Sequence, residues 1–261
     1  MPKNGTLEET RSYYQKILPF YEKESVVRAH LSFWRGLARR WRPRRILEIG
    51  AGLGRITAGL AREAPSIGLD VSLEMLSEAA RRRGKSGGAH FVAADMRRPL
   101  FPAAFDLIVA PGDPLSHLTR LSDRRQALSA VRRQLAPGGR FVIEGLYRRR
   151  GGEMVTPSRD VRHEGGVLRI DEAWSPVGVS DVWHARYRYR DRRHGKPDET
   201  LEAAMVARSW DPATIRPFFA ECGFEIERLW GDFDERPFRR SASRLVAVAR
   251  RAEDRRARAR R

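Results

Sequence analysis

The chain has 261 residues, of which 41% are hydrophobic, and it carries 51 Lys and Arg against 33 Asp and Glu, a formal net charge of +18. This length and apolar content exclude a disordered chain and suit one large α/β domain or two smaller ones. A single cysteine, Cys222, excludes a disulfide framework and a cysteine-built zinc site, and we expect it to be an inert buried thiol. The first residues form no apolar leader, and no stretch reaches the roughly 18 apolar residues of a membrane helix. We therefore expect a cytoplasmic protein without a membrane partner and without a metal.

The first forty residues predict two helices. Thr6 and Glu9 form a capping box before an amphipathic run that we expect Pro19 to end. A second run, from Val26 to Ala38, repeats its apolar residues at helical spacing. We expect residues 1–42 to form a helical lid.

Short apolar segments alternate with helical ones over residues 43–150. The predicted strands are residues 45–49, 66–70, 90–94, 105–109 and 140–144. The predicted helices between them are residues 55–63, 72–83 and 123–135, with Ser72 as a cap. Strands that alternate with helices form parallel βαβ units. The pattern predicts a doubly wound, Rossmann-like core.

The pattern changes after residue 150. Three period-two segments at 167–174, 181–189 and 199–210 are separated by turn residues, which predicts an antiparallel β insert over residues 151–207. A helix from Asp211 to Cys222, stopped by Gly223, and strands at 224–230 and 245–249 then complete the core over residues 208–249. The seven core strands predict one mostly parallel sheet, and residues 250–261 form a basic tail.

The positive charge is almost entirely arginine, with 46 Arg and 5 Lys. A field of this sign favours anionic partners such as nucleic acid. The Arg residues are dispersed, however, and are not interleaved with aromatic side chains that could stack on bases. We therefore favour arginine as the default surface residue, with nucleic-acid binding as the alternative.

One glycine-rich turn carries the strongest functional signal. Gly50-x-Gly52-x-Gly54 stands between a buried strand and a helix, where a ligand can approach the backbone and meet free N–H groups. Asp70 ends the second strand, where a carboxylate can accept both hydroxyls of a ribose. Asp95 ends the third, where it can meet the edge of a purine. The carboxyl ends of these strands line one crevice of an open α/β sheet, which predicts one nucleoside-binding site.

These segments resemble the class I S-adenosylmethionine-dependent methyltransferases. The matching segments, in the order and spacing of that family, are Ile46–Thr57, Gly68–Ser72, Ala93–Met96, Phe105–Val109 and Leu135–Phe141. The resemblance implies an enzyme that binds S-adenosyl-L-methionine and transfers its methyl group. It also implies that the antiparallel insert caps the substrate, as in sugar-amine and glycine N-methyltransferases.

The resemblance assigns roles to matched positions. The residues that would contact the methionine part, ribose and adenine of the cofactor are Glu48, Gly50, Ala51, Gly52, Asp70, Val71, Met75, Asp95 and Met96. Ala110 and Pro111 follow the fourth strand, next to the methyl group. His117 is the favoured general base, with Asp113 or a tyrosine as lesser candidates. Tyr21 would cover the cofactor, with Tyr13 and Tyr14 as the alternative.

Each of these residues also has a structural interpretation. Asp70 and Asp95 could be helix caps, and Met75 and Met96 could fill the core. His117 could bond to the backbone, and the tyrosines could belong to a buried helical face.

Three functions remain open from the sequence. We favour an N- or O-methyltransferase of a small molecule that releases S-adenosylhomocysteine. The alternatives are an RNA methyltransferase that uses the basic surface, and a catalytically silent S-adenosylmethionine-binding protein. The loop after the fourth strand lacks the Asn/Asp-Pro-Pro-aromatic signature of base-amino methyltransferases, although Asp113-Pro114 is a partial echo of it. An antiparallel cap with aromatic faces could also pair two subunits.

Overall fold

The computed structural model describes residues 6–28, 30–83, 87–147, 154–178, 180–242 and 244–253. The helices are α1 (Leu7–Arg28), α2 (Leu31–Trp41), α3 (Arg55–Leu60), α4 (Leu73–Arg83), the 3-10 helix η1 (Pro114–His117), α5 (Leu121–Gln134) and α6 (Ile215–Glu221). The strands are β1 (Ile46–Ile49), β2 (Ser66–Asp70), β3 (Ala89–Ala93), β4 (Phe105–Ala110), β5 (Leu135–Gly145), β6 (Met154–His163), β7 (Gly166–Pro176), β8 (Val182–Arg193), β9 (Glu199–Arg208), β10 (Phe224–Trp230) and β11 (Leu245–Arg251).

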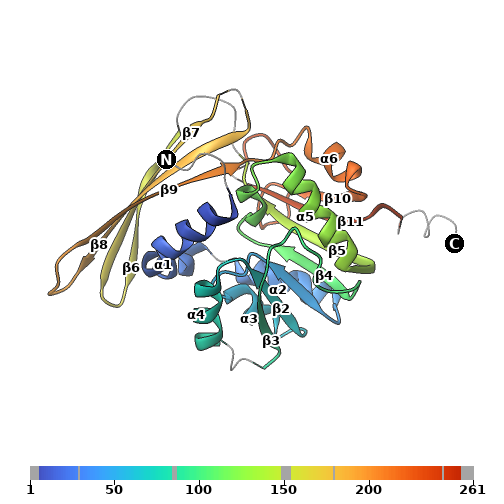
Figure 1. Ribbon diagram of the computed structural model, residues 1–261, viewed down its shortest axis with the longest axis horizontal. Helices are drawn as coiled ribbons and strands as arrows, with labels where there is room; N and C mark the ends of the chain where they lie inside the picture. The colour runs from blue at the N-terminus through green and yellow to red at the C-terminus, as the bar shows by residue number, and fades with distance from the viewer. Residues whose placement is uncertain are drawn as a thin grey trace.

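Seven strands form one sheet in the order β10-β11-β5-β4-β1-β2-β3 (Figure 1). The strands β1 to β5 pair in parallel, whereas β11 runs antiparallel to both β5 and β10. This confirms the predicted Rossmann-like, seven-stranded and mostly parallel sheet. The chain order reverses between β1 and β4, and open α/β sheets bind their ligands in the crevice at this point.

Helices cover both faces of the large sheet. On one face, Trp34 and Leu37 of α2 and Leu60 of α3 pack against Leu107 and Val142 of the sheet. On the other face, side chains of α5 and α6 pack against the remaining core positions of β1, β4, β5 and β11. The strands are apolar on both faces because both faces are covered.

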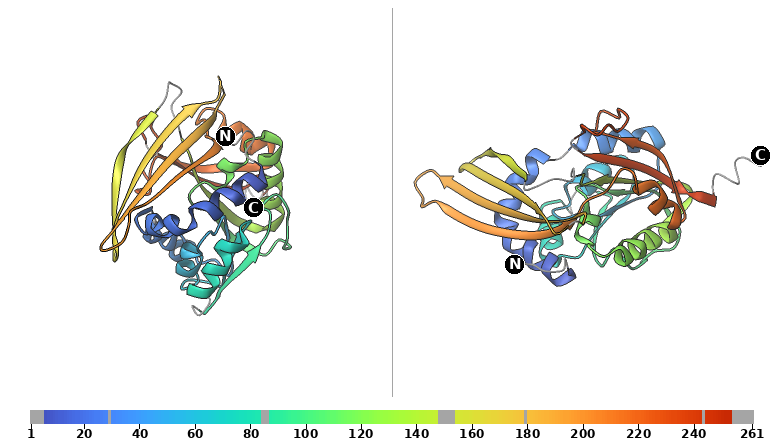
Figure 2. Two further views of the ribbon diagram at one scale, coloured as in Figure 1. Left: turned by 60° about the vertical axis from the view of Figure 1, so that its left-hand side comes forward. Right: turned by 90° about the horizontal axis from the view of Figure 1, so that it is seen from above.

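A second, four-stranded antiparallel sheet of order β6-β7-β8-β9 is inserted between β5 and α6. Its inner face packs against α1 through Ile17 and Phe20 on the helix and Ile170 and Tyr187 on the sheet. The views in Figures 1 and 2 show α1 lying between this sheet and the edge of the large sheet. Arg11 Nε of α1 donates to the Val71 carbonyl just beyond β2, 3.0 Å away. The helix therefore closes over the carboxyl ends of the central strands.

The prediction that Pro19 ends the first helix is wrong. The capping box forms as expected, since Thr6 N donates to Glu9 Oε2 (2.9 Å) and Glu9 N donates to Thr6 Oγ1 (3.2 Å). The helix then continues through Pro19 to Arg28. A proline inside a helix costs about 3 kcal/mol or more. Ile17 and Phe20 on either side of it are buried against the second sheet, and this burial offsets that cost.

The strand β6 was not predicted. Most of its residues are exposed, so its sequence lacks the alternation of a half-buried strand. Its pairing with β7 also shifts register between Thr156 and Arg159. The other three strands of the insert confirm the predicted antiparallel segments.

Close packing under the glycine-rich turn leads to a first prediction. Gly54 has φ +68°, and a Cβ there would meet the Phe91 ring and approach Ala79 Cβ to 2.9 Å. Gly138 has φ +75° but no neighbour within 4 Å of the same position. In urea unfolding, Gly138→Ala should cost about 1 kcal/mol from the left-handed backbone alone. Gly54→Ala should cost about 1–3 kcal/mol more, because the ring must move. Equal losses in the two variants would contradict the packing argument.

Candidate active site

Two adjoining cavities lie where the carboxyl ends of the central strands meet α1. One, of about 320 Å³, lies over the ends of β2 and β3. The other, of about 570 Å³, lies between the glycine-rich turn, α1 and the inner face of the second sheet. Both volumes are typical of small-molecule sites. Six residues line both cavities: Tyr14, Tyr21, Gly50, Pro111, Gly112 and His117. These shared residues mark where molecules bound in the two cavities would meet.

Asp70 connects the glycine-rich turn to the start of α4. Its carboxylate accepts a hydrogen bond from Gly52 N (Oδ2, 2.8 Å) and one from Ser72 N (Oδ1, 2.9 Å). Burial raises the pKa of Asp70 above its ordinary value, although these backbone N–H donors oppose the shift. Ser72 Oγ in turn accepts from Met75 N (3.3 Å), so the predicted cap of α4 is confirmed. Asp70 is thus held in place while one side of it lines the smaller cavity.

Asp95 also lines the smaller cavity and is paired with arginine. Arg97 Nη2 donates to Asp95 Oδ2 (2.7 Å), and Arg97 N donates to Asp95 Oδ1 (2.9 Å). Burial works against the charge of Asp95, but these bonds outweigh it, and the pKa of Asp95 lies below its ordinary value. Arg97 also reaches Asp123 Oδ1 at 3.3 Å. Asp95 is therefore a charged, oriented acceptor in the wall of the cavity.

Glu48 occupies the centre of the sheet, below the glycine-rich turn. Its side chain is buried and accepts a hydrogen bond from the Thr57 hydroxyl. Burial raises its pKa to about 8, although the bond from Thr57 opposes the shift. Glu48 therefore carries a proton at neutral pH, and it lines the larger cavity.

Replacing Glu48 by glutamine should remove part of the pH dependence of stability. The folded protein holds a proton on Glu48 that the unfolded chain loses above its ordinary pKa of 4.5. This contribution to the free energy of unfolding therefore falls as pH rises from about 4.5 to about 8, by up to ~1.4 kcal/mol per pH unit. In urea unfolding of the protein without cofactor, the free energy of unfolding of Glu48→Gln should increase relative to that of the wild type as pH rises across that interval. All other titrating groups are common to both proteins, so a constant difference would contradict the assignment.

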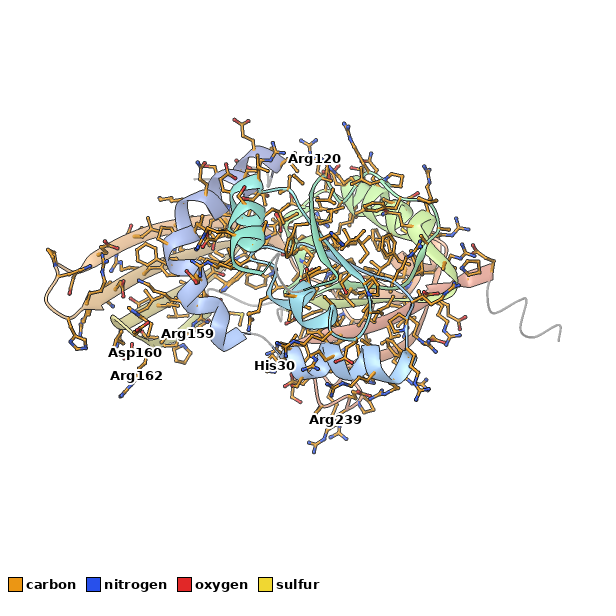
Figure 3. The ribbon with its side chains drawn as sticks, turned by 90° about the horizontal axis from the view of Figure 1, so that it is seen from below. His30, Arg120, Arg159, Asp160, Arg162 and Arg239 are labelled. Carbon is orange, nitrogen blue, oxygen red and sulfur yellow. The ribbon has the colours of Figure 1, made fainter. Side chains whose placement is uncertain are left out.

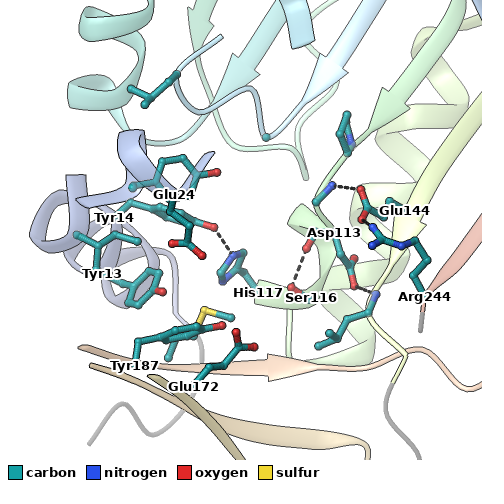
Figure 4. A pocket seen from close by; sticks show the side chains of 18 of the residues that line it. Tyr13, Tyr14, Glu24, Asp113, Ser116, His117, Glu144, Glu172, Tyr187 and Arg244 are labelled. Atoms are coloured by element: carbon teal, nitrogen blue, oxygen red, sulfur yellow. Dashed lines mark hydrogen bonds and ion pairs between the residues drawn. The ribbon is translucent and has the colours of Figure 1, made fainter. Parts of the chain in front are cut away.

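His117 is paired with a tyrosine of α1 at the boundary of the two cavities. The Tyr14 hydroxyl and His117 Nε2 share a hydrogen bond of 2.9 Å, and their rings meet edge to face (Figure 4). Burial lowers the pKa of His117 to about 4, so the imidazole is neutral at physiological pH. Its Nδ1 makes no hydrogen bond within the described part of the chain. A neutral imidazole in this position can accept a proton.

Asp113 holds the loop that carries His117. Its carboxylate accepts from Leu146 N (2.5 Å) and from Trp210 Nε1 (3.2 Å). Burial raises its pKa to about 6, and the charge of buried Arg124 opposes the shift. Both carboxylate oxygens are thus engaged in joining the loop after β4 to the two ends of the insert. Asp113 positions other groups, which differs from the predicted role of a base.

The structure brings most of the predicted site residues together. The predicted cofactor residues around the smaller cavity are Gly50, Gly52, Asp70, Val71, Met75, Asp95, Met96 and Pro111. Glu48 and Ala51 line only the larger cavity, and so does Asp113. Ala110 borders neither cavity, because its side chain is fully buried in the core, and its place beside the methyl group stays a prediction. Tyr21 lies over the turn, with its hydroxyl 3.8 Å from where a Cβ on Gly52 would be.

Several lining residues of the larger cavity were not predicted. They come from α1 and the second sheet and include Glu24, Arg159, Glu172, Tyr187 and Tyr189. The alternation of Trp183, Ala185, Tyr187 and Tyr189 marks one face of β8 and could have indicated the tyrosines. No local signal marks Glu24 or Arg159, because their partners lie far away in the chain.

Neither a membrane-spanning helix nor a cluster of metal ligands occurs in the described part of the chain. Over the described ranges, no helix is both long and apolar enough to span a bilayer. Within the same part of the chain, no three His, Cys, Asp or Glu side chains gather into a group that could hold a metal ion.

The chain is similar to known methyltransferases in sequence and in fold. Residues 46–139 match the family model described as a methyltransferase domain. YqeM of Bacillus subtilis is a relative whose name describes a methyltransferase. The two sequences are 25% identical over 80% of this chain and 85% of YqeM. The protein-L-isoaspartate O-methyltransferase of Hahella chejuensis is 30% identical over 61% of this chain and 80% of its own. Among solved structures, S-adenosylmethionine-bound CalS10 of Micromonospora echinaspora, an amino pentose methyltransferase, aligns with a TM-score of 0.73. That alignment covers 88% of this chain and 94% of CalS10 at 22% identity, which is evidence for a shared fold.

Proposed function

The chain belongs to the class I S-adenosylmethionine-dependent methyltransferases, and we propose that it methylates a nitrogen or oxygen atom of a small-molecule acceptor, releasing S-adenosylhomocysteine. One observation carries this proposal. A cavity with the family's nucleoside-binding residues meets a second, larger cavity at the Tyr14–His117 pair.

The residues around the smaller cavity fit the cofactor. Asp70 would accept the ribose hydroxyls, and Asp95 would accept from the adenine amino group, with Met75 and Met96 beside the ring. Gly52 has no side chain, so a ligand can approach its backbone closely. The methionine part of the cofactor would therefore have room beside it. When bound, the cofactor supplies an activated methyl group on a sulfonium ion.

The protein's own groups then have three tasks. Tyr21, Pro111 and Gly112 line both cavities and would orient the acceptor toward the methyl group, which can supply up to ~7–11 kcal/mol if the alignment is ideal. Helix α1 would exclude water from the junction. His117, with Tyr14, would take the proton that the acceptor loses.

A small acceptor is favoured over RNA. The larger cavity lies between α1 and the inner face of the second sheet, a space suited to a small molecule rather than to a strand. Many of the arginines that raise the net charge are paired with carboxylates, as Arg40 is with Glu235 and Arg188 with Glu202. The amino pentose substrate named for CalS10 also supports a small acceptor.

Replacing Asp70 tests the cofactor assignment. Asp70→Ala should weaken S-adenosylmethionine binding by about 10- to 150-fold, because hydrogen bonds to a charged group contribute ~1.5–3 kcal/mol. Asp106→Ala is the matched control. Asp106 also holds a backbone N–H (Arg44 N, 2.9 Å) but lies at the other end of its strand. Calorimetry should give the control the wild-type affinity, and an unchanged affinity in Asp70→Ala would refute the assignment.

Product formation tests the reaction itself. The wild type is incubated with S-adenosylmethionine and with pools of small amines, alcohols, carboxylic acids and RNA, and S-adenosylhomocysteine is quantified. We expect release with a small-molecule pool and none with RNA. Faster release with RNA, falling steeply with salt, would favour the RNA alternative.

A further inference from the structure

The larger cavity has a wall of acidic and aromatic side chains on the side facing away from the cofactor residues. We infer that this wall, formed by Tyr13, Glu24, Glu172 and Tyr187, recognises a cationic amine, and that the acceptor atom is the nitrogen of this amine. This inference rests on the proposed function and identifies the substrate class of the same site.

Two buried carboxylates from different elements face this cavity. Glu24 of α1 is 2% exposed and Glu172 of β7 is 9% exposed. Arg159 of β6 bridges them, with an ion pair to Glu24 Oε1 and a distance of 3.5 Å from Nη1 to Glu172 Oε2. In Figure 3, Arg159 lies beside α1, whereas Arg162 on the same strand extends into solvent. The protein thus keeps two carboxylates out of water, and such groups are costly to bury unless partners stabilise them.

The orientation of both carboxylates is fixed. Trp174 Nε1 donates to Glu172 Oε1 at 2.6 Å, and the Tyr189 hydroxyl donates to Glu24 Oε2 at 3.3 Å. Figure 4 shows both carboxylates on the same hollow as the His117 ring. An ammonium group in this hollow would meet negative charge without any rearrangement of the protein.

Tyr13 supplies an independent sign of a ligand. Its side chain is 9% exposed and lines the larger cavity, and no described residue bonds to its hydroxyl. The hydroxyl can therefore donate a hydrogen bond to a polar ligand in the cavity or accept one from it. Burial, with the nearby tyrosines and Glu24, raises the pKa of Tyr13 well above its ordinary value, so the hydroxyl stays neutral.

Aromatic rings complete the wall. Tyr187 lies between Tyr13 and Trp174, with ring centroids 6.3 Å from each, and stacks on Tyr189 at 6.0 Å. Faces of tyrosine and tryptophan attract ammonium groups, especially where water is excluded. Carboxylates and ring faces therefore favour the same kind of ligand.

The charges also distinguish nitrogen from acidic oxygen as the acceptor atom. A carboxylate or phenolate acceptor would be repelled by Glu24 and Glu172. An ammonium acceptor first loses one proton to the neutral Tyr14–His117 pair. The nitrogen lone pair then forms a bond to the methyl carbon as the carbon–sulfur bond breaks, and the positive charge moves from sulfur to nitrogen. The carboxylates stabilise the charge that develops on nitrogen.

The opposite end of the cavity carries different charges. Arg244 lines it and is paired with Glu144 at 2.9 Å (Figure 4). His30 also lines this end, stacked on Phe233 at 4.1 Å. At the acidic wall, two carboxylates face one arginine, Arg159, so an excess of negative charge is left there to select the end of the acceptor that carries nitrogen.

Three small probes of matched shape test the inference. They are choline, its uncharged carbon analogue 3,3-dimethylbutan-1-ol, and the anion 3,3-dimethylbutanoate. Each is titrated by ligand-observed NMR into the full chain saturated with S-adenosylhomocysteine. Choline should bind about tenfold or more tightly than the alcohol, and the anion should bind weakest. Equal binding of choline and the alcohol, or no binding of choline at millimolar concentration, would overturn the inference.

Variants assign the preference to the wall. Glu172→Gln and Glu24→Gln keep the size of the side chain and one acceptor oxygen each but remove one charge each, and each should weaken choline binding about tenfold while leaving binding of the alcohol unchanged. Glu202→Gln is the control, because its carboxylate is exposed and pairs with Arg188 away from the cavity. Tyr13→Phe should weaken choline without altering the charge of the wall. If the folded glutamine variants keep the wild-type preference, the wall is not the determinant. Loss of S-adenosylhomocysteine binding in the wild type would refute the proposed function instead, so the two failures are distinguishable.

Discussion

The variant His117→Ala should lower the rate of methyl transfer by about 10²- to 10⁴-fold, the usual contribution of general acid–base catalysis. The imidazole lies at the junction of the two cavities and is hydrogen-bonded to Tyr14, and no other described histidine lines both cavities. The measurement is single-turnover formation of S-adenosylhomocysteine with the fastest acceptor of the pools described above. Calorimetry should show cofactor affinity within about threefold of the wild type, a free-energy change under ~1 kcal/mol.

Tyr14→Phe separates orientation from proton transfer. It keeps the edge-to-face ring contact with His117 and removes the 2.9 Å hydrogen bond between them. We expect a smaller loss of rate than in His117→Ala, because the imidazole remains. If His117→Ala transferred the methyl group at the wild-type rate, the acceptor would release its proton directly to water and His117 would not be the base.

The pH dependence gives a second readout of His117. Because burial lowers the pKa of His117 to about 4, its basic form persists throughout the neutral range. The acidic limb that His117 contributes to kcat/KM should lie well below the ordinary value of 6.5, with activity falling as pH falls through about 4. A limb near 6.5 that disappears in His117→Ala would contradict this placement.

Asp113→Ala should lower the free energy of unfolding by about 3–5 kcal/mol, the cost of leaving a buried charge without its partner. The substitution would leave Leu146 N and Trp210 Nε1 without their acceptor. It would also remove the negative charge opposite Arg124, which is 2% exposed and stacked over the Trp210 ring at 4.0 Å. Urea unfolding measures the loss.

Two further variants test this assignment of Asp113. Asp113→Asn keeps one acceptor oxygen but not the charge. Its free energy of unfolding should therefore lie between those of the wild type and of Asp113→Ala. Asp106→Ala, which removes a half-buried carboxylate paired with Arg44, should cost no more than about 1 kcal/mol. If Asp113→Ala and Asp106→Ala unfold at the same denaturant concentration, Asp113 does not hold the loop.

The grouping of the residues around the smaller cavity could be predicted from the sequence because its signals are local. The glycine-rich turn, Asp70 and Asp95 each stand at the end of a short apolar segment, and parallel strands bring their carboxyl ends to one edge. The capping residues Thr6 and Ser72 act within three residues of themselves. Patterns of this kind depend on backbone periodicity and not on partners elsewhere in the chain.

Some predictions failed because packing outweighed a local preference. Pro19 lies inside a helix since its neighbours are buried on the second sheet. Asp113 is a candidate base in the sequence, and the structure shows it buried and bonded to Leu146 and Trp210. Neither outcome follows from the residues around these positions.

The sequence by itself determined the parallel core, the residues that line the smaller cavity and the presence of an antiparallel insert. Only the tertiary structure decided that α1 lies between the two sheets and which of its tyrosines meets His117. The Tyr14–His117 bond joins residues 103 positions apart, and the Glu24–Arg159 pair spans 135. Periodicity states which face of an element is buried but not what covers it. The acceptor side of the site is built from such long-range contacts, so its chemistry became visible only once the chain was folded.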